Sequence, residues 1–163
     1  MLAETVFTQD GRRYVQGDKN NKCNFAYLEK PHVHGEGGRL VIRARFTGRS
    51  SLNALGICVG LGDAFDVALA ATPEFHDGNL ELTKVSATSD GKTGYYIRRV
   101  CTALSGSLGK QFRYPLSSQF QRALEDPSIQ RTYPRQLRNF TVPSIRVTDD
   151  ALVLVVDFEL TVK

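Results

Sequence analysis

A pair of histidines is the first arrangement in the sequence that could do chemistry. His32 and His34 are separated by one residue in a segment with strand character, so both imidazoles project from the same face. Glu36, or the distant pair His76 and Asp77, would have to supply the remaining ligands of a metal site. Two of the usual three or four ligands beside a glycine turn arise readily by chance. We therefore predict ordinary exposed histidines, with no metal and no cofactor.

Nucleophilic catalysis and phosphate binding both lack their sequence signatures. A serine or cysteine nucleophile needs a base and an orienting group, but there is no GxSxG elbow, and the three histidines stand outside any recognisable triad. The glycine-rich stretches 35–38 and 60–63 lack the preceding strand, the glycine spacing and the helix start of a phosphate loop. We therefore predict no catalytic residues and a protein that is not an enzyme.

Four arginines form the clearest charged pattern. In the segment 39–49, apolar side chains occupy one parity and basic ones the other, so one face of a strand should be core. The basic face, which we call the arginine ladder, consists of Arg39, Arg43, Arg45 and Arg49. Such a row could contact an anionic membrane surface, a polyanion or an acidic protein partner. The alternative is a solvated face balanced by acidic residues of neighbouring strands, such as Asp66 or Glu81.

Length and composition indicate one domain over residues 1–163. A chain of this length with 41% hydrophobic residues can bury one core but has no room for a second domain. The basic residues behind the +4 net charge are spread along the chain, so we predict no nucleic-acid partner. The three cysteines form no CxxC pair. Cys101 is predicted to be a small core residue, whereas Cys23 and Cys58 could pair in an oxidising compartment.

Location in the cell follows from two expectations about the sequence. No run of about 18 apolar residues occurs, so we predict no membrane-spanning helix. The first residues lack the basic, apolar and small-residue plan of a secretory signal. We expect either a cytoplasmic protein or, if a leader has been removed, a periplasmic or membrane-associated one.

Hydrophobic periodicity divides the domain into three regions. Residues 1–90 have the alternation of strands joined by turns, and we expect hairpins there. Over residues 94–125 the period changes to that of an amphipathic helix, which Pro115 kinks or splits. Residues 139–162 return to the strand pattern. The sequence therefore predicts an α+β domain.

Breaker residues set the expected limits of the strands in the first region. Pro31 and Pro73 are each expected to end the strand that precedes them, because proline donates no backbone hydrogen bond. The alternation of the next strand slips between Leu82 and Val85. A bulge at that point would return the following side chains to the buried face.

Three apolar segments follow one another in a recognisable order, with the helical region between the second and the third. They are Phe65–Pro73, Gly78–Val85 and Leu152–Val162. This order resembles the tubular lipid-binding (TULIP) superfamily, which includes small bacterial lipoproteins of unknown function and modules of the bactericidal/permeability-increasing protein. The likeness covers residues 38–162. The chain departs from the family because it shows neither a lipoprotein leader nor an amphipathic helix before the first strands.

The resemblance implies a long, strongly curved antiparallel sheet wrapped around one long Pro-broken amphipathic helix. An apolar groove between them would bind a lipid or other hydrophobic small molecule without catalysis. The residues expected to line it are Phe46, Leu69, Leu82, Ile97, Cys101, Leu104, Leu108, Phe112, Leu154 and Phe158. The same residues could equally form a filled core, since a domain of this size needs most of its large apolar side chains to fold. The alternative function is a protein-interaction or scaffold domain that uses the arginine ladder or a sheet edge.

Overall fold

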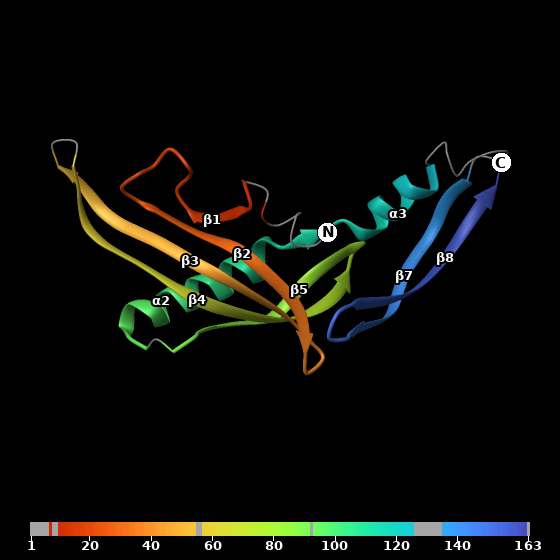
Figure 1. Ribbon diagram of the computed structural model, residues 1–163. Coiled ribbons are helices and arrows are strands. Elements are labelled where there is room, and N and C mark those ends of the chain that lie inside the picture. Colours follow the sequence, from red (N-terminus) through yellow and green to blue (C-terminus); the bar gives the residue numbers. More distant parts are fainter. Residues whose placement is uncertain (1–6, 8–9, 55–56, 92, 126–134, 163) are drawn as a thin grey trace.

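Two parts follow one another along the chain (Figure 1). The computed structural model describes residue 7 and residues 10–54, 57–91, 93–125 and 135–162. The main body comprises strands β1 to β6 and helix α2, and the C-terminal unit comprises helix α3 and the hairpin β7–β8. The elements are β1 (Arg12–Gln16), β2 (Phe25–Glu36), β3 (Arg39–Ala54), β4 (Ile57–His76), β5 (Asn79–Ser89), α2 (Tyr95–Gln111), β6 (Arg113–Tyr114), α3 (Leu116–Glu125), β7 (Arg135–Val147) and β8 (Leu152–Val162).

The main body is built on a curled antiparallel sheet in which each strand pairs with the next along the chain, in the order β1-β2-β3-β4-β5-β6. Strands β3 and β4 form its longest hairpin, with unbroken register from Leu40 opposite Ala71 to Ala54 opposite Ile57. Because side chains alternate between the two faces of a strand, Ile42 and Phe46 point into the core. The arginine ladder lies on the outer face, as predicted.

Pro31 and Pro73 lie inside strands, so the prediction that each of them ends its strand is wrong. Strand β2 continues past Pro31 to Glu36, with a register shift against β3 beside it. Strand β4 continues past Pro73, which is paired with Leu82 of β5. Among the described residues, neither strand has a ladder partner on its other side at that point, because β1 reaches only Glu29 of β2 and β3 reaches only Ala71 of β4. A residue without an N–H is tolerated at such a local edge.

The bulge predicted between Leu82 and Val85 is confirmed. Pairing of β4 with β5 shifts in register between Ala70 and Thr72, and Lys84 adopts a positive φ of 48°. The Arg39 guanidinium crosses the outer face to this irregularity, donating hydrogen bonds to the carbonyl oxygens of Ala70 at 2.9 Å and Lys84 at 2.6 Å. Arg39 thus satisfies carbonyl groups around the bulge.

The single long helix predicted over residues 94–125 is wrong, and with it the fold class of a sheet wrapped around one helix. Helix α2 stops at Gln111, and α3 begins after Pro115. Between them, Arg113 and Tyr114 pair with Glu81 and Leu80 as strand β6. Proline keeps the preceding residue out of the helical region and favours the start of a new helix. Strand β6 also covers part of the free edge of β5. Neither helix in the described part of the chain has the length and apolar character needed to cross a membrane.

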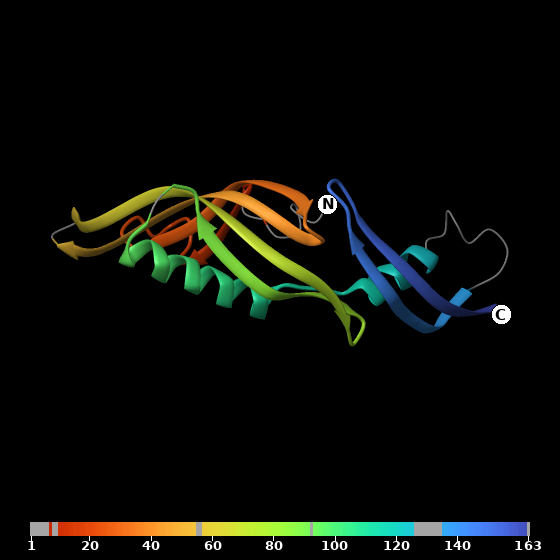
Figure 2. The ribbon, with the colours of Figure 1, turned by 90° about the horizontal axis from the view of Figure 1, so that it is seen from below.

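The core lies between α2 and the inner face of the sheet, where Figure 2 shows the helix running along one face. Phe46 and Phe65 form its centre, with ring centroids 4.9 Å apart and both rings only 2% exposed. Helix α2 lies close against β5, because a Cβ on Gly109 would fall 3.3 Å from Val85 Cγ2. This close approach fixes one flank of the helix and leaves the other flank facing β1 and β2.

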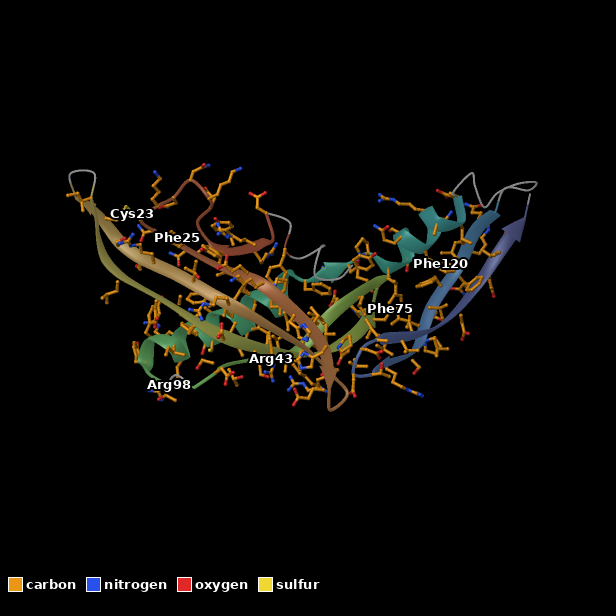
Figure 3. The ribbon with its side chains drawn as sticks, in the orientation of Figure 1. Cys23, Phe25, Arg43, Phe75, Arg98 and Phe120 are labelled. Atoms are coloured by element: carbon orange, nitrogen blue, oxygen red, sulfur yellow. A yellow bond between two sulfur atoms is a disulfide. The ribbon has the colours of Figure 1, made fainter. Side chains whose placement is uncertain are left out.

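The C-terminal unit contacts the main body at its β2–β3 and β4–β5 ends. Gly35 N donates a hydrogen bond to Asp149 O at 2.9 Å, and Ser117 N donates to Gly78 O at 3.0 Å. The Phe75 ring of β4 lies 5.8 Å from the ring of Phe140 on β7, and Figure 3 shows Phe75 beside this junction. These contacts join the two parts without a continuous sheet.

A disulfide bond closes the opposite end of the main body. Cys23, before β2, is bonded to Cys58 of β4, with Cα atoms 5.2 Å apart (Figure 3). The pairing considered for an oxidising compartment is therefore present. Cys101 is free and buried in the core, as predicted, and desolvation raises the pKa of its thiol.

Candidate ligand-binding groove

A groove runs between α2 and the β1–β2 side of the sheet. It consists of a wide chamber of about 550 Å³, near the start of α2, and a narrow chamber of about 100 Å³, near its end. Val15, Leu104 and Ser107 line both chambers, so the two adjoin. The groove exists because α2 leans on β5, which leaves space along its other flank.

One face of α2 lines the wide chamber, and its side chains are large near the start of the helix and small further along. Tyr96, Val100, Ala103 and Ser107 recur at three- and four-residue intervals, so they share one face of α2. This face adjoins the face that carries the core residues Ile97, Cys101 and Leu104. Alanine and serine in the C-terminal half of the lining face leave volume that larger side chains would fill.

Opposite the helix, a glycine of β3 keeps the wall of the wide chamber open. Gly48 is buried, and a Cβ at this position would fall 3.3 Å from the Tyr96 hydroxyl and closer still to the ring of Phe46. Any larger residue would therefore press against both aromatic side chains. Gly48 and Phe46, together with Ala26 of β2, form the sheet side of the chamber.

The structure brings together part of the set of predicted lining residues. Five of them face the groove: Phe46, Leu69, Leu104, Leu108 and Phe112. Leu82, Ile97 and Cys101 are packed in the core beside it. Leu154 and Phe158 belong to the C-terminal unit, where the Phe158 ring packs at a tilt against Phe120 of α3, with ring centroids 5.1 Å apart. The two β8 residues are therefore not part of this groove.

Several lining residues were missed by the sequence analysis. Leu28 and Ile42 line the narrow chamber and share the inward parity of their strands, a signal that could have identified them. Ala103 and Ser107 carried a weaker signal, namely small residues flanking the apolar stripe of the helix. Phe7 is buried over the narrow chamber, but nothing in the alternation of its neighbours distinguishes it.

Polar side chains stand at the mouth of the wide chamber. Tyr95, Tyr96 and Arg99 come from the first turns of α2, and Gln16 comes from the end of β1. Arg99 Nη1 donates a hydrogen bond to the Tyr95 hydroxyl at 3.1 Å, and its guanidinium carbon lies 5.7 Å from the centroid of that ring. Desolvation, with a smaller contribution from the charge of Asp63, raises the pKa of Tyr96. Tyr96 is therefore a neutral hydrogen-bonding group at neutral pH.

The arginine ladder is partly neutralised. Arg45 Nη1 lies 3.2 Å from Asp66 Oδ1, which is the balancing pair named in the alternative interpretation. Glu81 instead pairs with Arg113, at 3.1 Å from Oε1 to Nε. Arg43 has no carboxylate partner among the residues that the structure describes, and Figure 3 shows it on the sheet of the main body.

The histidines do not gather into a metal site. The rings of His32 and His34 lie 5.5 Å apart, and His34 Nε2 is 3.6 Å from Glu36 Oε2. His76 forms a separate pair with Asp77 at 3.1 Å, in an exposed turn. Within the described ranges, no three side chains of His, Cys, Asp or Glu are placed to hold a metal ion.

The groove can hold an apolar chain along α2 with a polar group at the wide mouth. Its walls are mainly hydrocarbon. Its charged donors are Arg99 and Arg49 at the wide chamber and Arg13 and Arg113 at the narrow one. Water would leave the apolar walls on binding, which is the main source of affinity for such a ligand. No family model, curated protein or solved structure matches this chain.

Proposed function

We propose that the protein binds a lipid or other hydrophobic small molecule in the groove between α2 and the β1–β2 side of the sheet, without catalysis. The volume of the wide chamber, about 550 Å³, falls within the range of about 300–1,000 Å³ that is common for small-molecule sites. Burial of apolar ligand surface contributes about 25 cal/mol per Å². The likeness to the TULIP superfamily belongs to the same proposal and rests on the curled sheet with a helix along it.

The observation that carries this proposal is the run of small residues that faces the sheet. A filled core would place large side chains at Ala103 and Ser107. The large side chains Ile97 and Leu104 lie instead on the adjacent face of α2, which packs in the core. The protein thus has a packed core with an apolar groove along one side of it.

The disulfide supports a location for this binding. Disulfides persist in oxidising compartments and are rare in the cytosol. The Cys23–Cys58 bond closes the end of the main body near the wide chamber, whose walls include the neighbouring residues Phe25 and Ala26. We therefore place the proposed function outside the reducing cytoplasm.

A plug at the junction of the two chambers tests the proposal. Ser107→Trp places an indole where both chambers meet, and Thr102→Trp places the same indole on an exposed helix position outside the groove. The delipidated full chain is titrated with a fluorescent fatty acid, and circular dichroism verifies the fold of both variants. We expect saturable uptake by the unsubstituted chain and Thr102→Trp, and at least a tenfold loss in Ser107→Trp. Absence of uptake by the unsubstituted chain, or equal uptake by both variants, would contradict the proposal.

The protein-partner alternative has less support on the described surface. Arg39 is engaged by the carbonyl groups of the bulge, and Arg45 is paired with Asp66. These two members of the arginine ladder therefore have structural roles in the fold. Arg43 and Arg49 are exposed, and neither has a carboxylate partner among the described residues. Charge reversal at Arg43 is the remaining test, because Arg49 also lines the wide chamber.

A further inference from the structure

The polar groups around the groove are distributed unevenly between its two chambers. At the narrow chamber, Arg113 is held by Glu81 at 3.1 Å, and Arg13 also has an interaction partner. At the wide chamber, Tyr95 and Arg99 stand at the mouth. The wide end is therefore where a ligand meets a cation that is not already paired with a carboxylate.

Arg99 is held in place by a neutral group. Its hydrogen bond to the Tyr95 hydroxyl and the ring beneath it orient the guanidinium without neutralising it. A guanidinium has five N–H donors, so most of them stay available for a further acceptor. In the described part of the chain, no carboxylate lies within ion-pair distance of Arg99. The first turn of α2 also contains no acidic residue.

The carboxylate of Asp63 is close enough to the mouth to affect Tyr96. Asp63 faces Tyr96, whose pKa it helps to raise, but Asp63 is not among the residues that line the wide chamber. Asp63 also has an interaction of its own. The charge of the residues that line the wide chamber is therefore positive, and it comes from Arg99 of α2 and Arg49 of β3.

We propose that the ligand is an anionic amphiphile whose charged head group binds Arg99 at the wide mouth, while its hydrocarbon chain extends past Ser107 towards Phe112. This inference rests on the proposed function and adds the charge and the direction of the ligand. The head group receives charge-assisted hydrogen bonds from the guanidinium. The chain occupies the apolar walls that the two chambers share at Val15 and Leu104.

Two neighbouring arginines of α2 provide a matched experiment. Arg99 lines the groove, whereas Arg98 is exposed and does not line it, and Figure 3 shows Arg98 on the side of α2 away from the sheet. Binding of dodecanoate and of the uncharged dodecanol is measured by displacement of a fluorescent fatty acid. Both probes have the same chain length, so their difference reports the head group.

The unsubstituted chain is expected to bind dodecanoate about tenfold more tightly than dodecanol, as one charge-assisted hydrogen bond would give. Arg99→Gln should reduce this preference and leave dodecanol binding nearly unchanged, whereas Arg98→Gln should keep the full preference and Arg99→Lys should restore most of it. Equal binding of the two probes by the unsubstituted chain would overturn the inference but leave the proposed function intact. An equal loss for both probes in Arg99→Gln would also overturn it. Failure of both probes to bind would refute the proposed function itself.

Discussion

The main body and the C-terminal unit use the same plan, a sheet with a helix on one face, yet only the main body excludes water. Every buried hydrophobic residue in the described ranges lies between Phe7 and Leu104. Helix α3 buries none of its residues, and Val153 and Val155 of β8 are 45% and 51% exposed. The difference is one of area, because a two-stranded hairpin and a ten-residue helix cannot enclose a core. The C-terminal unit therefore depends on its contacts with the main body.

The largest expected effect contrasts one phenylalanine from each part. Phe65→Ala removes a ring that is 2% exposed, and it should lower the free energy of unfolding of the main body by about 3–5 kcal/mol. Phe158→Ala removes a ring that is 43% exposed, and it should cost about 1 kcal/mol or less. Urea unfolding followed by circular dichroism measures both. Equal costs would mean that the C-terminal unit has a core of its own.

Removal of the disulfide should weaken the main body alone. The bond closes a loop with a sequence separation of 35 residues, for which chain entropy predicts about 2–4 kcal/mol. The double substitution Cys23→Ser and Cys58→Ser should lower the stability of β1 to β6 by that amount. Hydrogen exchange resolved by peptide is the measurement, with the hairpin β7–β8 as internal reference. A larger change in the hairpin than in the sheet would contradict the division into two parts.

The junction should respond to a single methyl group. A Cβ on Gly35 would meet the carbonyl oxygen of Thr148 and fall 2.7 Å from Val147 Cγ1. Gly35→Ala should therefore cost about 1–3 kcal/mol of overpacking, expressed as faster hydrogen exchange in β7–β8. Gly106→Ala is the control, since a Cβ there meets no atom within 4 Å. Unchanged exchange of the hairpin would show that the junction does not stabilise it.

The smallest effect tests how α2 lies against the sheet. Gly106→Ala should raise the stability of the main body by about 0.5–1 kcal/mol, because alanine is the better helix former. Gly109→Ala should gain less or nothing, since its Cβ would lie 3.3 Å from Val85 Cγ2. Thermal unfolding compares the two variants. Equal gains in stability would indicate that α2 does not lie close against β5. The groove could then not be explained by that close approach.

Local patterns predicted the parts of the fold that local chemistry determines. Alternation in β3 placed Phe46 inside and Arg43 outside, and the parity slip after Leu82 correctly located the bulge. These features depend on residues that are close in sequence, because a strand changes face with every residue.

The features that the sequence analysis missed depend on distant partners. Strand β6 forms because β5 has a free edge, which no pattern within residues 112–115 reveals. Pro31 is accepted because β1 is too short to reach it. The position of the groove depends on which flank of α2 lies against the sheet. Gly109 allows the close approach to β5, but the sequence does not show that β5 is its neighbour. Non-local geometry decided each of these cases.

Strand β6 also has a mechanical consequence. Arg113 and Tyr114 are anchored to β5 by backbone pairing. A ligand that displaced α2 would therefore swing the helix about Phe112, the residue between α2 and β6. The anchor isolates α3 from such a swing, since α3 begins beyond it. If the proposed ligand displaces α2, the hairpin β7–β8 can therefore keep its contacts with the main body.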